Sequence, residues 1–200
     1  MVDDPELIVR DARRWVAWLR RNHATESGAW LVLARKGTTD PTSLTYDEAL
    51  EAALRFGWID GQRRRRDEAT FGQRFTPRRA RSPWSTRNVE IAGRLIEAGL
   101  MHEAGIAEIE RAKADGRWAA AYEGQATMQV PDDLAVALAA EPRALAMFDI
   151  LTRQNRFAIL FRTTSAKRPE TRARRIEQFV AMLARGETVY PQKASLDELP

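Results

Sequence analysis

The chain has 200 residues, of which 44% are hydrophobic and 30% are charged, so it can bury an ordinary core in one large domain or two small lobes. No apolar run approaches the roughly 20 residues that cross a bilayer, and the acidic first residues lack the pattern of a signal peptide. Cysteine is absent, which excludes disulfides and thiol nucleophiles. We therefore expect a cytoplasmic protein that does not insert into a membrane.

The first part of the chain alternates helical and strand patterns. Residues 10–22 have the periodicity of an amphipathic helix, and residues 29–34 form an apolar run of strand length. Thr45 and Glu48 have the spacing of a capping box, which starts a second helix. Gly57 is placed to end that helix as its C′ residue.

The next part predicts a small antiparallel sheet followed by another helix. Residues 63–67 and 70–76 are expected to be the arms of a meander, with Gly72 at a bulge. A basic, irregular loop over 77–84 follows. Ser85 is then a good N-cap for a helix with an apolar stripe.

Beyond residue 100 the periodicity is helical throughout, and several prolines stand where first-turn prolines belong. The sequence therefore predicts an α+β fold, in which a small antiparallel sheet with helices packs against an all-helical C-terminal half. The expected lobes are residues 1–100 and 101–186, sharing a core, with a flexible tail over 187–200. The helices expected in the second half are 103–114, 117–122, 131–140, 142–152, 154–164 and 169–185.

Positive charge is concentrated in two segments. Residues 60–81 hold eight arginines against three acids, and residues 153–175 hold eight basic residues against one acid, although the whole chain carries only +4. The two segments thus have an excess of +12, and the remainder carries −8. Arginine forks suit carboxylates and phosphates, so these segments predict an anion-attracting surface. The alternative is a solvated basic face that pairs with the acidic remainder.

The common signatures of enzymes are missing. The sequence has no glycine-rich phosphate loop, no dinucleotide-binding fingerprint and no nucleophile elbow. His23 and His102 do not belong to a zinc-binding pattern. We expect neither a metal nor a cofactor.

The residues around the loop after the predicted sheet suggest a ligand site, because arginine forks, flat indoles and a helix N-terminus suit an anionic, partly planar ligand. Asp60 and Tyr46 are the candidates for acid/base catalysis, although Asp60 also suits a turn that pairs with an arginine. Trp58 also suits the core, and Arg172 and Arg175 could instead bridge to Glu170 or Asp149. The candidate ligand-binding residues are Trp58, Arg74, Arg78, Trp84 and Asn88, with Lys167, Arg172 and Arg175 from the helical half.

A set of short phrases runs through the sequence: Tyr46 with Ala49-Leu50 and Ala53-Leu54; Phe56-Gly57-Trp58-Ile59-Asp60-Gly61; Arg74-Phe75-Thr76-Pro77-Arg78; Ser82-Pro83-Trp84-Ser85 with Asn88; Leu95-Ile96 with Gly99 and Met101; Ala112-Lys113 with Gly116-Arg117-Trp118; and Ala166-Lys167 with Thr171-Arg172 and Arg175-Ile176. In their order and spacing these phrases resemble the YdeI/OmpD-associated family, also called the bacteriocin-protection family. The resemblance runs from about residue 10 to 186 and implies an association with resistance to antimicrobial peptides. Arg55 stands where relatives often have a cysteine, so any chemistry of that cysteine is lost here.

Three functions remain open from the sequence. The first is a protein that binds an anionic small molecule or peptide in an arginine-rich cleft. The second is an enzyme that acts on an anionic metabolite or antibiotic, in which arginines stabilise developing charge. The third is a nucleic-acid binder, which the charge supports but no recognised binding motif does. The oligomeric state does not follow from the sequence.

Overall fold

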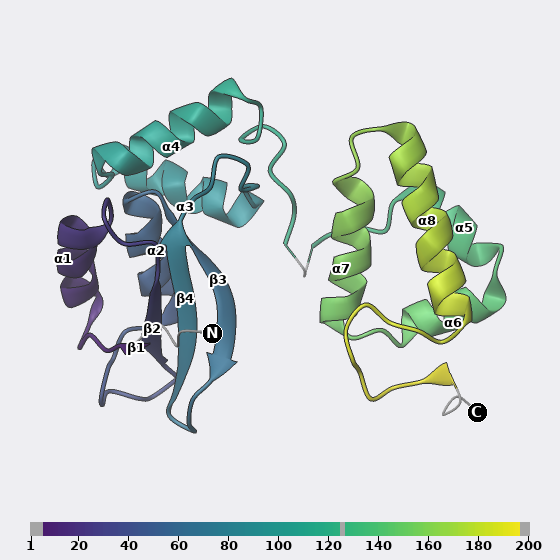
Figure 1. The fold of residues 1–200 in the computed structure, drawn as a ribbon, viewed down its shortest axis with the longest axis horizontal. Helices are drawn as coiled ribbons and strands as arrows, with labels where there is room; N and C mark the ends of the chain where they lie inside the picture. The colour runs from purple at the N-terminus through teal and green to yellow at the C-terminus, as the bar shows by residue number, and fades with distance from the viewer. Residues whose placement is uncertain (1–5, 125–126, 197–200) are drawn as a thin grey trace. The chain divides into compact units, whose positions relative to one another are not determined.

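A computed structural model describes residues 6–124 and 127–196. The chain divides into two compact units, Met1–Tyr122 and Glu123–Pro200 (Figure 1). The sequence placed the lobe boundary after residue 100, whereas the structure keeps helix α4 (Glu103–Ala114) in the first unit. The reason is packing, because Ile109 and Ala112 of α4 belong to the same core as Trp58 and Leu54.

The first unit is built on a mixed sheet of strand order β1-β2-β4-β3. β1 runs parallel to β2, and the other pairs are antiparallel. The expected strand at 29–34 and the expected meander are confirmed, whereas β1 has no signal in the sequence because it is only two residues long. The strands are β1 (Glu6–Leu7), β2 (Ala29–Ala34), β3 (Trp58–Arg65) and β4 (Thr70–Pro77).

Helix α2 (Tyr46–Arg55) is the central helix of this unit, since it contacts β2, β3 and the helices α1, α3 and α4. Two of these neighbours are α1 (Ala12–Asn22) and α3 (Thr86–Glu97), which pack against α2. The predicted capping box is present, because Thr45 and Glu48 bond each other's backbone N–H groups. Gly57 follows with φ of +74°, a conformation that favours glycine at a helix end.

Two local expectations were wrong. Gly72 is not at the bulge, because the register shift lies in β3 between Asp60 and Arg63. Gly72 instead makes room for Arg64, whose Cγ would lie 2.8 Å from an added Cβ. The expected helix at 117–122 is absent, since this segment turns back to the start of α3, where the Tyr122 N–H donates to the Trp84 carbonyl at 2.9 Å.

The second unit is a helical bundle with its own core around Leu134, Met147, Phe148, Ile159 and Leu183. Part of the expected flexible tail is packed onto it, because the Tyr190 N–H donates to Asn155 Oδ1 at 2.8 Å. Residues 197–200 of that tail lie outside the described residues. The helices are α5 (Asp132–Ala139), α6 (Pro142–Asp149), α7 (Arg153–Thr164) and α8 (Pro169–Ala184). Among the described residues, no helix is both long and apolar enough to cross a membrane.

Candidate functional site

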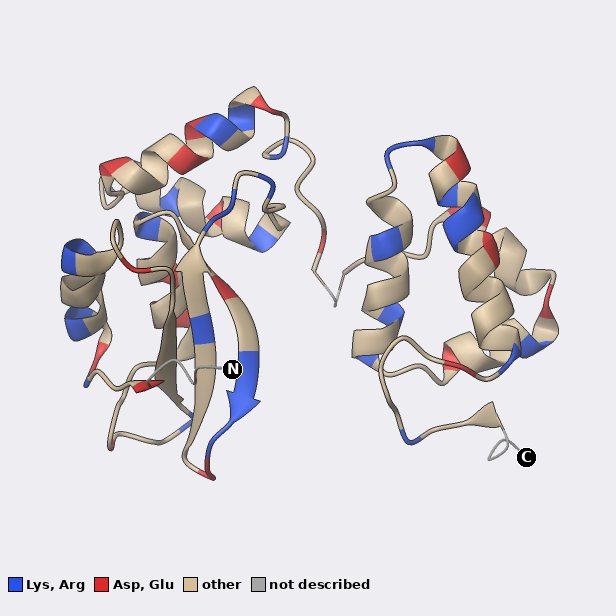
Figure 2. Cartoon of the chain, viewed as in Figure 1, with Lys and Arg blue, Asp and Glu red and all other residues tan. Residues whose placement is uncertain are grey.

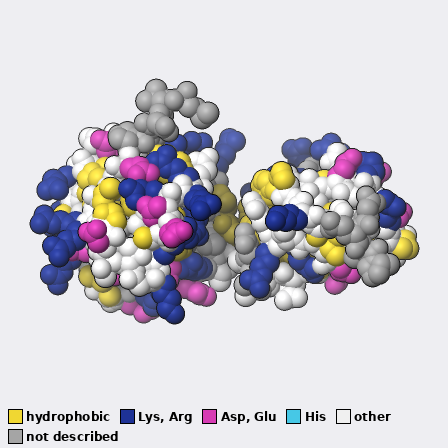
Figure 3. All heavy atoms as spheres, turned by 90° about the horizontal axis from the view of Figure 1, so that it is seen from below, with side chains coloured by type: hydrophobic (Ala, Val, Ile, Leu, Met, Phe, Trp, Pro, Cys, Tyr) yellow, Lys and Arg dark blue, Asp and Glu magenta, His cyan; other side chains and the backbone are white. Residues whose placement is uncertain are grey.

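The arginines of the first basic segment are largely engaged within the first unit. Arg64 donates to Glu6 at 2.9 Å and lies over the Trp30 ring at 4.4 Å. Arg66 donates to Glu6 and Asp67, and Arg63 lies 3.9 Å from the centroid of the Phe71 ring. These side chains cover the sheet. On the face displayed in Figure 3, the positive side chains of this unit are dispersed and do not form one patch.

Asp60 and Tyr46, the candidates for acid/base chemistry, are in direct contact. The Tyr46 hydroxyl donates to Asp60 Oδ2 at 2.8 Å. Burial, and then the neighbouring Asp60 carboxylate, raise the pKa of Tyr46 well above its usual value. The pKa of Tyr122 is also raised by burial and by Asp60. Both phenols therefore stay protonated at neutral pH.

Arg78 is buried against Trp84, with only 6% of its surface exposed. Its guanidinium carbon lies 3.7 Å from the Trp84 ring centroid, and Nη1 donates to the Pro83 carbonyl at 3.1 Å. Burial lowers the pKa of Arg78 to about 10, against the opposing effect of Glu108, so the side chain is charged at neutral pH. Arg78 Nε, Arg78 Nη2 and Trp84 Nε1 are buried and have no hydrogen-bond acceptor among the described residues.

The charges around Arg78 nearly cancel. Glu108 of α4 is 4% exposed and pairs with Arg111 at 2.9 Å and with Arg117 at 3.6 Å. Arg117 also donates to Asp115 and to the Ser82 carbonyl. Because two carboxylates, Asp60 and Glu108, face Arg78, this Asp60–Arg78 centre has little net positive potential to attract an anion.

Two of the remaining candidates of the first unit, Trp58 and Asn88, are held by structural contacts. Trp58 is 1% exposed, and its indole donates to the His23 carbonyl at 3.1 Å, as the core interpretation expects. Asn88 is buried in the first turn of α3, where its N–H donates to Ser85 Oγ at 3.2 Å, so Ser85 is the N-cap. Arg74 is half-buried on β4, opposite Trp30 of β2.

The candidates from the helical half lie in the second unit. Arg172 forms a bidentate pair with Asp133 at 2.5 and 2.8 Å, and it donates to the Thr163 carbonyl. The acid that it pairs with is therefore neither Glu170 nor Asp149. Arg175 donates to the Arg162 carbonyl, and Lys167 is exposed. That these residues close one cleft with Arg74 and Arg78 stays a prediction.

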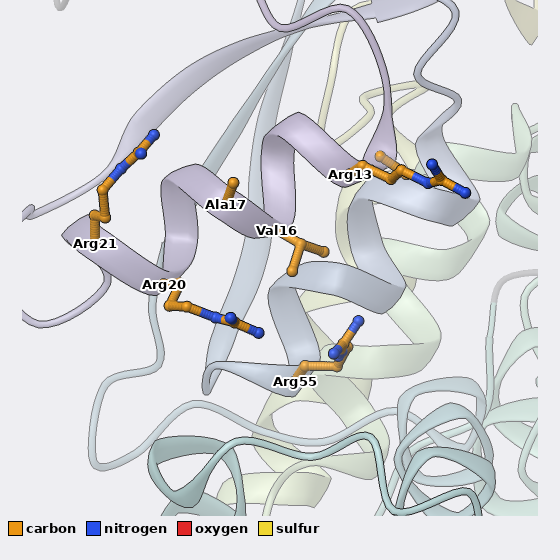
Figure 4. A pocket seen from close by; sticks show the side chains of 7 residues that line it. Arg13, Val16, Ala17, Arg20, Arg21 and Arg55 are labelled. Atoms are coloured by element: carbon orange, nitrogen blue, oxygen red, sulfur yellow. The ribbon is translucent and has the colours of Figure 1, made fainter.

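A groove of about 510 Å³ lies on α1 and is lined by four arginines (Figure 4). Its floor is apolar, and its lining contains no acidic residue. Figure 4 shows the Arg20 side chain extending toward Arg55, whereas Arg21 points away from it. We call this feature the α1 groove. Its lining is Ala12, Arg13, Val16, Ala17, Arg20, Arg21 and Arg55.

The groove follows from the periodicity of α1. Arg13, Arg20 and Arg21 are spaced at i, i+7 and i+8, so they line one side of the helix, while Trp15 and Leu19 are buried on the other. Arg55 ends α2 and is fixed by the donation of its Nε to the Leu100 carbonyl at 2.8 Å. Figure 2 shows α1 with positive residues only, whereas α4 alternates both signs.

The arginines that α1 contributes to the groove lack an ion pair within the described residues. Arg13, Arg20 and Arg21 have no hydrogen bond or ion pair with the part of the chain that the structure describes. Arg13 is also in the first turn of α1, where the helix dipole disfavours a cation by about 0.3–1 kcal/mol. Helix stability therefore does not account for its presence.

The local density of arginines along the sequence does not predict this groove, because its arginines are brought together by helical spacing. The arginines of α1 occur as two adjacent pairs, Arg13-Arg14 and Arg20-Arg21, and such pairs raise the number of arginines in a short stretch of sequence only slightly. The signal that was available is the i, i+7 spacing of Arg13 and Arg20 around Val16. Within residues 6–124 and 127–196, no group of three or more side chains of the metal-binding kinds is assembled.

Two family models match separate parts of the chain. Residues 7–108 match a family described as "Domain of unknown function (DUF8412)", and residues 127–186 match the family described as "Bacteriocin-protection, YdeI or OmpD-Associated". No curated protein and no solved structure shows a significant match. The bacteriocin-protection resemblance is thus confirmed over the helices of the second unit, and a different family covers most of the first unit. The chain belongs to the DUF8412 family, whose model spans just over half of it, and residues 127–186 are similar to the bacteriocin-protection, YdeI or OmpD-associated family.

Proposed function

We propose that the first unit binds an anionic ligand with an apolar part in the α1 groove. We further propose that this binding serves the protection against antimicrobial compounds with which the family of the second unit is associated. The observation that carries the proposal is the set of four arginines around an apolar floor without an acid among the lining residues. The Asp60–Arg78 centre, by contrast, holds its own counter-charges.

Coulomb attraction favours an anion in the α1 groove over one at the Asp60–Arg78 centre. A carboxylate about 4 Å from one guanidinium gains about 1 kcal/mol in water and about 4 kcal/mol near a protein surface. An anion in the groove meets Arg13, Arg20 and Arg21, whose side chains have no hydrogen bond or ion pair with the described residues. At the Asp60–Arg78 centre the same anion would also meet Asp60 and Glu108, which repel it.

Calorimetric titration with naphthalene-2-sulfonate, an anion with a flat apolar ring, tests the proposal. Arg20→Ala and Arg55→Ala should each weaken binding about tenfold, which corresponds to about 1.4 kcal/mol. Arg14→Ala is the matched control, because Arg14 lies on the same exposed part of α1 but does not line the groove. Equal losses in all three variants, or no binding to the unaltered chain, would contradict the proposal.

A further inference from the structure

The α1 groove is elongated along a helix, and this shape bears on the size of its ligand. Arg13 and Arg20 are seven residues apart in one helix, which separates them by about 10 Å along the axis at about 1.5 Å per residue. A single carboxylate or phosphate group would have to draw both long side chains together. Two negative groups about two helical turns apart match the spacing of the two arginines directly.

The space between the positive ends is apolar and shallow. Ala12, Val16 and Ala17 form the floor, and the small alanines let a partner approach the backbone of α1 closely. Arg55 connects this floor to Leu100, which is 45% exposed and whose carbonyl holds the arginine in place. Apolar surface with a polar rim is typical of an interaction site.

The lining distinguishes among classes of partner. No aromatic side chain lines the groove, so it offers no stacking platform for the bases of a nucleic acid. The apolar residues lie at the floor and not on a projecting edge, which does not suit insertion into a flat membrane surface. A cationic peptide would be repelled. Apolar contacts flanked by carboxylates on one face are what an acidic amphipathic helix presents.

We propose that the α1 groove is the docking site for an acidic amphipathic helix of a partner protein. Its apolar face lies on Val16 and Ala17, and carboxylates spaced by about seven residues pair with Arg13 and Arg20. This inference rests on the proposed function and names the class of its ligand.

The test uses the full chain and a labelled peptide of about 14 residues, with glutamates about seven residues apart beside a leucine stripe. The control peptide has the same composition in an order that places glutamates on every face. Fluorescence anisotropy should show binding of the amphipathic peptide at least about tenfold tighter than that of the control. Arg13→Ala and Arg20→Ala should each remove about tenfold, and Arg14→Ala should change the affinity less than about twofold.

The outcomes separate the two proposals. Equal binding of both peptides, together with groove-dependent binding of naphthalene-2-sulfonate, would overturn the docking inference and leave the anion site standing. Loss of groove dependence for both probes would overturn both proposals. Two further results would also overturn the inference. One is sedimentation with anionic vesicles, and the other is binding of an oligonucleotide, in either case with a stronger dependence on Arg13 and Arg20 than peptide binding shows. Circular dichroism of each variant confirms that these exposed substitutions leave the fold intact.

Discussion

Gly105 lets the start of α4 approach the end of α2, and its substitution by alanine tests that close contact. An added Cβ would lie 2.3 Å from the Arg55 carbonyl oxygen and 2.6 Å from Met101 Cε. The methionine can move, but the carbonyl belongs to the end of α2 and accepts the His102 N–H at 3.0 Å. We therefore expect Gly105→Ala to push the start of α4 away from α2.

The magnitude follows from opposing terms. Overpacking costs about 1–3 kcal/mol and weakening the His102 hydrogen bond about 1 kcal/mol, whereas replacing glycine in a helix gains about 1 kcal/mol. The net loss is about 1–3 kcal/mol, which lowers the melting temperature of the first unit by about 4–12 °C. Differential scanning calorimetry of the full chain measures it.

Gly93→Ala is the matched control for this substitution. Gly93 is also in a helix, α3, but an added Cβ there would meet no atom within 4 Å. We expect this variant to gain about 0.5–1 kcal/mol. If Gly105→Ala were as stable as Gly93→Ala, the close contact between α2 and α4 would be refuted.

Three further substitutions test other parts of the structure. Ser85→Ala removes the N-cap of α3 and should cost about 0.5–2 kcal/mol in urea unfolding, and covalent labelling of Ser85 by a phosphonylating probe would contradict its role as a cap. Arg172→Ala removes the pair with Asp133 and should destabilise the second unit by about 1–3 kcal/mol without changing anion binding in calorimetry. The hydrogen bond from Arg172 lowers the pKa of Asp133, so this difference should be present above about pH 4 and vanish as the pH falls through the folded-state value. Tyr46→Phe should lower the free energy of unfolding by about 1 kcal/mol at neutral pH, because the hydrogen bond to Asp60 is lost. Since the folded-state pKa of Tyr46 is raised, this difference in stability between the wild type and the variant should decrease as the pH rises above about 10.

Most of the secondary structure was predictable because local signals determine it. The strand at 29–34 and the helix at 103–114 have the predicted bounds, and Ser85 and Thr45 cap their helices as expected. The segment 117–122 could not be predicted, since its conformation depends on hydrogen bonds to Trp84 and Thr86 across the chain. The boundary between the units depends in the same way on the packing of α4, which no local pattern encodes.

The candidate site was predicted less well, because charge density does not reveal which charges are paired. Arg64 and Arg66 pair with Glu6, Arg172 pairs with Asp133, and these acids are distant from their arginines in sequence. Tyr46 and Asp60, the acid/base candidates, are in contact, and so are Arg78 and Trp84, two of the ligand-binding candidates; these roles stay predictions. What identifies the α1 groove is the absence of acids from its lining.

The most direct test of the α1 groove is a chemical-shift map of the isotopically labelled full chain titrated with naphthalene-2-sulfonate. We expect the largest amide shifts on residues 12–21 of α1 and on Arg55, with little change near Arg172 of the second unit. Shifts centred on Arg78 and Trp84, or on Arg172 and Arg175, with α1 unchanged, would contradict binding in the α1 groove. They would instead support the ligand-binding residues that the sequence predicted.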